Sequence, residues 1–179
     1  MKFSVTLITA LWLATVGATN AVGADTREQF LATLQSLCGQ RFDGMLTYAI
    51  DPKNPYVGQK MSTEIVCTGS DIRMPVAVGD DHSRTWIFTR IGAGLDLRHD
   101  HRHPDGTPEI VTMYGGQATD TGSALAQSFL ADAVTFKLFP GSETNVWTIS
   151  FSADRSVLTY HLDRHAKPRI EFVMQRVVP

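Results

Sequence analysis

Three histidines alternate with charged residues between positions 99 and 103, and this spacing is the strongest chemical lead in the chain. Successive side chains of a β-strand point to opposite faces, so one face would carry Leu95, Leu97, His99, His101 and His103. The other face would carry Asp96, Arg98, Asp100 and Arg102, and alternating acids and bases are typical of a solvated face. We therefore expect the histidines to continue the apolar side, toward a core or a cavity.

A metal site is one interpretation of these imidazoles. His99 and His101 are close enough in sequence to reach one ion, and imidazole nitrogen is a common ligand of zinc and other divalent transition metals. His103 would lie about 13 Å from His99 along a straight strand, so a site of all three requires a bend or a bulge. Otherwise further ligands are needed, and residue type alone suggests His82, Asp105, Glu109, His161 and Asp163.

A ligand site without metal is a second interpretation, because protonated imidazoles at the mouth of a barrel can bind an acid or a phosphate. Arg84 and Trp86 share one face of a predicted strand and suit an anionic or aromatic ligand. The expected ligand-binding residues are His99, His101, Arg84, Trp86 and Tyr114. A structural interpretation stays open, in which the two histidines are hydrogen-bonded within the sheet and His103 lies at a wet turn.

No catalytic residues are indicated. The chain lacks a Gly-x-Ser-x-Gly elbow, a phosphate-binding glycine loop, a dinucleotide fingerprint and a His-Glu-x-x-His motif. Asp80, Asp81 and His82 suit a turn that enters a strand better than an acid–base group. Whether the protein is an enzyme is left open by these motifs.

The first 24 residues have the pattern of a signal peptide. A basic start at Lys2 precedes an apolar stretch over 4–17, and Val22-Gly23-Ala24 fits the small-residue cleavage rule. An uncleaved anchor is the alternative; no later stretch is long enough to span a bilayer. We therefore predict one β-rich domain over 25–179, secreted or periplasmic.

The charge balance argues against a nucleic-acid partner. Removal of residues 1–24 takes away only Lys2 among the charged residues, so the 16 basic residues become 15 against 18 acidic ones. There is no basic run of the kind that binds a phosphate backbone. A small molecule is the expected partner.

Two cysteines, Cys38 and Cys67, would both be present after cleavage. In an oxidising compartment such a pair normally closes, and the disulfide would stabilise the fold by about 3–4 kcal/mol. A redox or metal role is less favoured, because the spacing is not Cys-x-x-Cys.

One helix and about ten strands are predicted. Residues 26–29 resemble a capping box, Phe30, Leu31, Leu34 and Leu37 follow at helical spacing, and Gly39 ends the helix. Alternation predicts strands near 42–50, 60–68, 71–78, 84–91, 94–103, 108–115, 133–139, 145–151, 156–163 and 169–177. Within the connector 116–131, residues 124–130 suit two helical turns, and the connector itself is a candidate cover for a ligand opening.

Short strands with one apolar face can close as an antiparallel barrel or stack as a β-sandwich, and we favour the barrel. Its architecture resembles the calycin class, which includes the lipocalins, with one N-terminal helix covering an end. The lipocalin Gly-x-Trp motif has no match near Phe42 and Gly44, so the resemblance is one of architecture.

Several short motifs also resemble a group of small exported bacterial proteins. These motifs are Leu37-Cys38-Gly39, Phe42-x-Gly44, Ser83-Arg84-Thr85-Trp86, residues 99–107 and Tyr114-Gly115-Gly116. The resemblance implies export from a bacterial cytoplasm and no particular activity. The expected function is an exported small-ligand-binding barrel with a histidine-lined site. The alternatives are a zinc-type hydrolase or isomerase on a cupin-like barrel and an envelope protein-interaction module.

Overall fold

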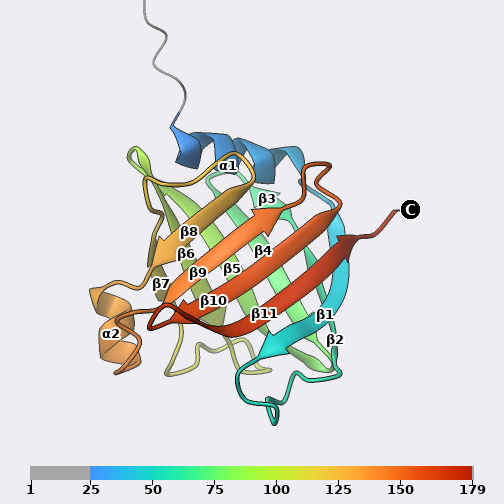
Figure 1. The fold of residues 1–179 in the computed structure, drawn as a ribbon, viewed down its shortest axis with the longest axis vertical. Helices are drawn as coiled ribbons and strands as arrows, with labels where there is room; N and C mark the ends of the chain where they lie inside the picture. Colours follow the sequence, from blue (N-terminus) through green and yellow to red (C-terminus); the bar gives the residue numbers. More distant parts are fainter. Residues whose placement is uncertain (1–24, 179) are drawn as a thin grey trace, which may run out of the picture.

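Eleven antiparallel strands form a nearly closed barrel in the computed structural model, which describes residues 25–178. A helix, α1, lies across one end of the barrel (Figure 1). The mainly β barrel with one N-terminal helix is thus confirmed, and the sandwich alternative is not adopted. The predicted signal peptide, 1–24, lies outside the described residues.

The elements follow one another mostly as hairpins. The helices are α1 (Thr26–Ser36) and α2 (Ala133–Leu138). The strands are β1 (Arg41–Ala49), β2 (Lys60–Glu64), β3 (Val66–Thr68), β4 (Asp71–Val78), β5 (Asp81–Ile91), β6 (Gly94–His101), β7 (Tyr114–Gln117), β8 (Ala126–Leu130), β9 (Val146–Phe151), β10 (Val157–Arg164) and β11 (Lys167–Arg176).

The strand order around the barrel is β7-β6-β5-β4-β2-β1-β11-β10-β9-β8, with β3 paired to β4. The first and last strands of this order meet just beyond β7. There Ala118 bridges Phe129, and the backbone N–H of Thr119 donates to the carbonyl of Ser128 over 2.9 Å. This contact brings the two edges of the sheet together.

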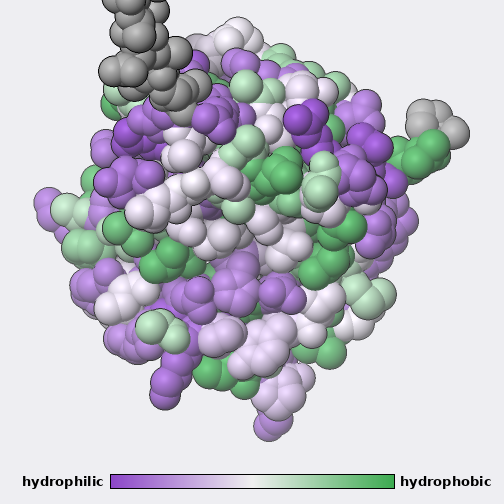
Figure 2. Space-filling view, turned by 45° about the horizontal axis from the view of Figure 1, so that its top comes forward, coloured by the Kyte–Doolittle hydropathy of each residue, from purple (hydrophilic) through white to green (hydrophobic). Residues whose placement is uncertain are grey.

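The α1 end of the barrel is filled. Phe30 of α1 is fully buried and its ring packs against Phe88 of β5 and Phe151 of β9, at 6.5 and 6.3 Å between centroids. Polar and apolar side chains are mixed over the surface that Figure 2 brings forward from this end. The helix begins at Thr26, and its N-cap lies one residue before the predicted capping box: Asp25 accepts from the backbone N–H of Arg27.

A disulfide fastens the helix to the sheet. Cys38 follows α1 directly and bonds to Cys67 of β3, as the sequence predicted. Two backbone hydrogen bonds support the same junction: Gly39 N–H donates to the Ile65 carbonyl, and Ile65 N–H donates to the Gln40 carbonyl. The helix is therefore held by covalent, polar and apolar contacts together.

Residues 124–139 correct the sequence prediction. The segment expected to be helical contains strand β8, and the segment expected to be a strand contains helix α2. Asp132 decides the second case, because its carboxylate accepts from the backbone N–H of Thr135 and begins a helix. In β8, Gln127 and Phe129 alternate inward, a two-residue period that the run of small residues before them obscures.

The predicted strand near 108–115 is also displaced, because β7 begins only at Tyr114. Its two glycines allow close approach on both sides. A Cβ on Gly115 would lie 1.9 Å from the Leu97 carbonyl oxygen, and one on Gly116 would lie 1.7 Å from that of Leu130. Only glycine fits between these backbones, so the pair sets the position of the adjoining Tyr114.

Candidate functional site

A cavity of about 210 Å³ opens at the end of the barrel opposite α1, which we call the mouth. Strand β5 runs from the mouth to the α1 end: Arg84 lines the cavity, and Phe88, four residues later, packs against Phe30 of α1. The lining is mainly aromatic and aliphatic with a few polar groups. It comprises Tyr56, Met61, Val76, Val78, Arg84, Trp86, His99, His101, Tyr114, Phe139, Asn145, Trp147, Tyr160, Leu162, Arg164, Ile170 and Phe172.

All five residues predicted to bind a ligand line this one cavity, namely His99, His101, Arg84, Trp86 and Tyr114. Cross-strand pairing brings them together, since Trp86 is opposite His99, Arg84 is opposite His101, and His99 is opposite Tyr114. Their contact with a ligand stays a prediction. The connector 116–131 contributes no residue to the lining, so its predicted role as a cover for this opening is wrong.

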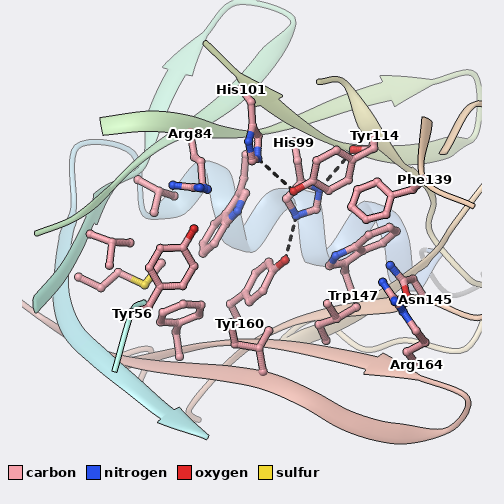
Figure 3. A pocket seen from close by; sticks show the side chains of 17 residues that line it. Tyr56, Arg84, His99, His101, Tyr114, Phe139, Asn145, Trp147, Tyr160 and Arg164 are labelled. Atoms are coloured by element: carbon pink, nitrogen blue, oxygen red, sulfur yellow. Dashed lines mark hydrogen bonds between the residues drawn. The ribbon is translucent and has the colours of Figure 1, made fainter. Parts of the chain in front are cut away.

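His99 is the most deeply placed polar group of the cavity wall. Its side chain is 3% exposed, and both ring nitrogens have partners. Nδ1 lies 3.3 Å from the Tyr114 carbonyl, which only accepts, so Nδ1 carries the proton. Nε2 therefore accepts from the Tyr160 hydroxyl over 3.0 Å (Figure 3). Burial lowers the pKa of His99 to about 3, and the ring is a neutral structural element at physiological pH.

Tyr114 connects the two histidines. Its ring stacks on His99 with 4.7 Å between centroids, and its hydroxyl lies 3.0 Å from Nε2 of His101. The carboxylate of Glu109 is 3.9 Å from the other His101 nitrogen, which favours an Nδ1–H facing Glu109 and an Nε2 that accepts from Tyr114. Burial raises the pKa of Tyr114 to about 12 and lowers that of His101. Both groups are thus neutral at pH 7.

Two further aromatic contacts form the floor of the cavity. Trp86 and Tyr160 stack almost in parallel, with 4.5 Å between ring centroids and 7° between planes. Trp147 packs against His99 at 5.1 Å. Burial raises the pKa of Tyr160 well above its usual value, so its hydroxyl stays a proton donor to His99.

Two arginines line opposite sides of the cavity (Figure 3). Arg84 forms an ion pair with Asp81, and its guanidinium lies 5.2 Å from the centre of the Tyr56 ring. Burial acts to raise the pKa of Asp81, but hydrogen bonds from Ser83 and Arg84 outweigh it and lower that pKa to about 2. Asp81 is therefore ionised and neutralises the charge of Arg84.

Arg164 is bound differently. Its Nε donates to the side-chain oxygen of Asn145 over 2.7 Å, and Asn145 is 3% exposed. Asn145 is itself fixed by its backbone, whose N–H donates to Ser142 and whose carbonyl accepts from Ala131. Within residues 25–178, Arg164 has no ion pair with a carboxylate.

The charged face of β6 corrects another prediction. Asp96 and Asp100 are 4% and 5% exposed, so the acidic positions of this face are covered, whereas Arg102 at its end is exposed. Arg98 donates to Asp96 and to Asp132, and Asp100 accepts from Arg102 and Thr112. The alternating charges pair with one another beneath the chain that returns through α2 and the loop after β6, which is why burial is tolerated.

The three histidines do not converge. His103 lies beyond β6 on an exposed turn, while His99 and His101 face the cavity. In the described part of the chain, no group of three or more His, Cys, Asp or Glu side chains is placed to hold a metal ion. Straight pairing of β6 through His101 explains this, since the bend that a three-histidine site requires does not occur.

Sequence reasoning missed Arg164 and Asn145, although a signal for both was present. Inward positions of β10 run through Leu158, Tyr160 and Leu162 to Arg164. The inward positions of β9 begin at Trp147, two residues after Asn145. The rule that singled out the histidines, a polar residue continuing an apolar face, applies equally here. Tyr56 lies in a loop without periodicity, and no pattern indicates it.

The cavity can bind an organic molecule by stacking and by a few polar contacts. None of its seventeen lining residues is a carboxylate. The imidazoles and the hydroxyl groups of Tyr114 and Tyr160 are paired within the wall, and Arg164 supplies a positive charge that no ion pair within residues 25–178 compensates. This set is typical of a site that orients a ligand by apolar contact and a small number of polar groups.

No helix in the described residues is long and apolar enough to cross a membrane. A comparison with protein families gives no matching family model, and a search of curated proteins gives no significant match.

Proposed function

We propose that the protein is an exported barrel that binds a small organic ligand in the cavity at its mouth. The observation that carries this proposal is the asymmetry of the barrel interior. Aromatic rings fill the end beneath α1, whereas the other end holds a cavity of about 210 Å³ with aromatic walls. An interior that needed only to be stable would be filled throughout.

The neutral state of the wall supports binding by a preformed site. His99 and Tyr160 are buried and Tyr114 is partly buried; all three are uncharged, and His99 contacts both tyrosines by hydrogen bonds and stacks on Tyr114. Their ring positions are therefore fixed before a ligand enters. A preformed site loses little entropy on binding.

Export is supported by the disulfide and by the sequence of residues 1–24. Disulfides persist in oxidising compartments and are rare in the cytosol, and Cys38–Cys67 is the bond that fastens α1. We therefore place the protein in the periplasm or outside the cell.

Binding of N-phenyl-1-naphthylamine, a neutral probe whose fluorescence rises in apolar surroundings, tests the proposal. Leu162→Trp should fill the cavity and abolish the signal, because Leu162 lines it. Thr159→Trp is the matched control, since position 159 is on the opposite face of β10. Saturable binding by wild type and the control, with loss in Leu162→Trp, supports the proposal. Equal signals in all three proteins, or none in wild type, overturn it.

A further inference from the structure

The two arginines of the cavity differ in how their charge is compensated. Arg84 has an ionised carboxylate as its partner, and Glu109 also lies on its side of the mouth, beside His101. Arg164 has only the neutral amide of Asn145. Glu143 interacts with Arg164 through solvent as a surface charge of opposite sign, but it forms no ion pair with it; its side chain is exposed and accepts from the backbone N–H of Gly141.

The contact with Asn145 orients the guanidinium rather than neutralising it. Nε of Arg164 is the donor in that hydrogen bond, and in the described chain the two Nη groups make no hydrogen bond. Paired Nη donors match the two oxygens of a carboxylate. A partly desolvated cation without an ion-pair partner is stabilised by a nearby negative charge, which an anionic ligand in the cavity would supply.

Apolar walls adjoin this cation. Trp147 pairs across the strands with Leu162, two residues before Arg164, so both lie on the same inward face. Figure 3 shows Phe139 and Trp147 on the same side of the cavity as Asn145 and Arg164. A flat ring could therefore pack against these side chains while a carboxylate attached to it contacts Arg164.

Resting on the proposed function, we propose that the ligand class is a compact aromatic carboxylic acid, with its carboxylate on Arg164 and its ring against Trp147 and Phe139. Asn145 is a positioning residue that holds the guanidinium toward the cavity. Arg84 contributes little to the charge preference, because Asp81 already compensates it.

Paired ligands separate charge from shape. We would measure the affinity of 1-naphthoate and of its neutral isostere 1-naphthamide, following tryptophan fluorescence of the full mature chain. Wild type should bind the acid about tenfold more tightly than the amide, as expected for a charge-assisted hydrogen-bond pair. In Arg164→Leu the ratio should fall to about one while the amide affinity is retained.

Three variants control this measurement. Arg84→Leu should change the ratio by less than about threefold, because its charge is already paired. Asn145→Ala should lower the acid affinity and leave the amide affinity unchanged, whereas a merely structural role would weaken both. Arg164→Lys keeps the charge and should retain part of the preference, which guards against misfolding of the leucine variant.

The outcomes distinguish this inference from the proposed function. A wild-type ratio near one, with both compounds bound and with binding lost in Leu162→Trp, overturns the acid class but leaves a small-ligand carrier. A preference that persists in Arg164→Leu and disappears in Arg84→Leu overturns the placement of the carboxylate. If neither compound nor N-phenyl-1-naphthylamine binds wild type, both proposals are wrong.

Discussion

The two ends of the barrel use aromatic residues in opposite ways. Beneath α1, the rings of Phe30, Phe88 and Phe151 pack together within the hydrophobic core. At the mouth, Tyr114 and Tyr160 stack on neighbouring rings and also hydrogen-bond to histidines, leaving a cavity between the walls. Stability and recognition are thus separated along the barrel axis, so a substitution should affect mainly one of them.

The largest expected effect is on the closed end. Phe30→Ala should lower the free energy of unfolding by about 3–5 kcal/mol, because it removes a fully buried ring and leaves a cavity. Urea denaturation followed by circular dichroism measures this. Val134→Ala on α2 is the control, since Val134 is 53% exposed and its loss should cost less than about 0.5 kcal/mol. A cost below about 1 kcal/mol for Phe30→Ala would show that the α1 end is not the main source of stability.

Loss of the disulfide should have the next largest effect. A Cys38→Ser/Cys67→Ser variant opens a loop with a sequence separation of 29 and should be less stable by about 3–4 kcal/mol. Reduction of the wild type should lower the denaturation midpoint similarly, and the reductant should leave the variant unchanged. Equal midpoints for the oxidised and reduced wild type would contradict this assignment.

Acid should act on the mouth through His99. Its pKa falls from an ordinary value near 6.5 to about 3 on folding, so between these pH values the unfolded chain binds a proton that the folded chain excludes. Stability is therefore complete above pH 6.5 and is lost as the pH falls toward 3, at up to about 1.4 kcal/mol per pH unit from this residue.

Unfolding measured from pH 7 to pH 4 tests this slope. His99→Gln should flatten the dependence, although the variant is less stable at neutral pH. His103→Gln is the control, because His103 is exposed. Identical slopes for wild type and His99→Gln would show that the imidazole is not excluded from protonation.

Tyr160→Phe should cost about 1 kcal/mol, because Nε2 of the buried His99 loses its donor. The ring itself and its stacking on Trp86 are retained. Thermal unfolding compares this variant with Tyr48→Phe, because Tyr48 is 42% exposed. An equal melting temperature for both variants would show that the His99–Tyr160 hydrogen bond does not contribute to stability.

The smallest expected effect is that of Arg164→Leu on stability. No ion pair is broken within the described chain, and the Asn145 oxygen that loses its donor lines the cavity, so the change in unfolding free energy should stay below about 1 kcal/mol. Urea denaturation of this variant beside wild type provides the check. A loss of more than about 2 kcal/mol in unfolding free energy would show that Arg164 stabilises the fold, and that the mouth is not specialised for recognition.

Alternation in the sequence predicts most of the strands and much of the mouth, whereas it fits a barrel and a sandwich equally and does not decide between them. It worked for β6, β9 and β10, where one face is buried and Leu97, Ile149 and Leu158 recur at the required period. It failed where a single contact overrides periodicity, as at Asp132, whose carboxylate begins α2. It also misjudged the charged face of β6, because whether a face is covered depends on the return path of a distant segment.

The site was predicted in part for the same reason. His99, His101, Arg84 and Trp86 lie on strands, and the two-residue period assigns their direction. Compensation of charge depends on tertiary pairing: Asp81 reaches Arg84, and no carboxylate in the described chain pairs with Arg164. Nothing in the order of residues distinguishes these two arginines.

The disulfide between α1 and β3 has a kinetic consequence for the proposed ligand. Because the disulfide holds α1 across one end of the barrel, a molecule in the cavity would enter and leave only through the mouth. An incoming molecule could not displace the occupant from behind. Exchange would then proceed at the off-rate of the first molecule, whatever the concentration of the second.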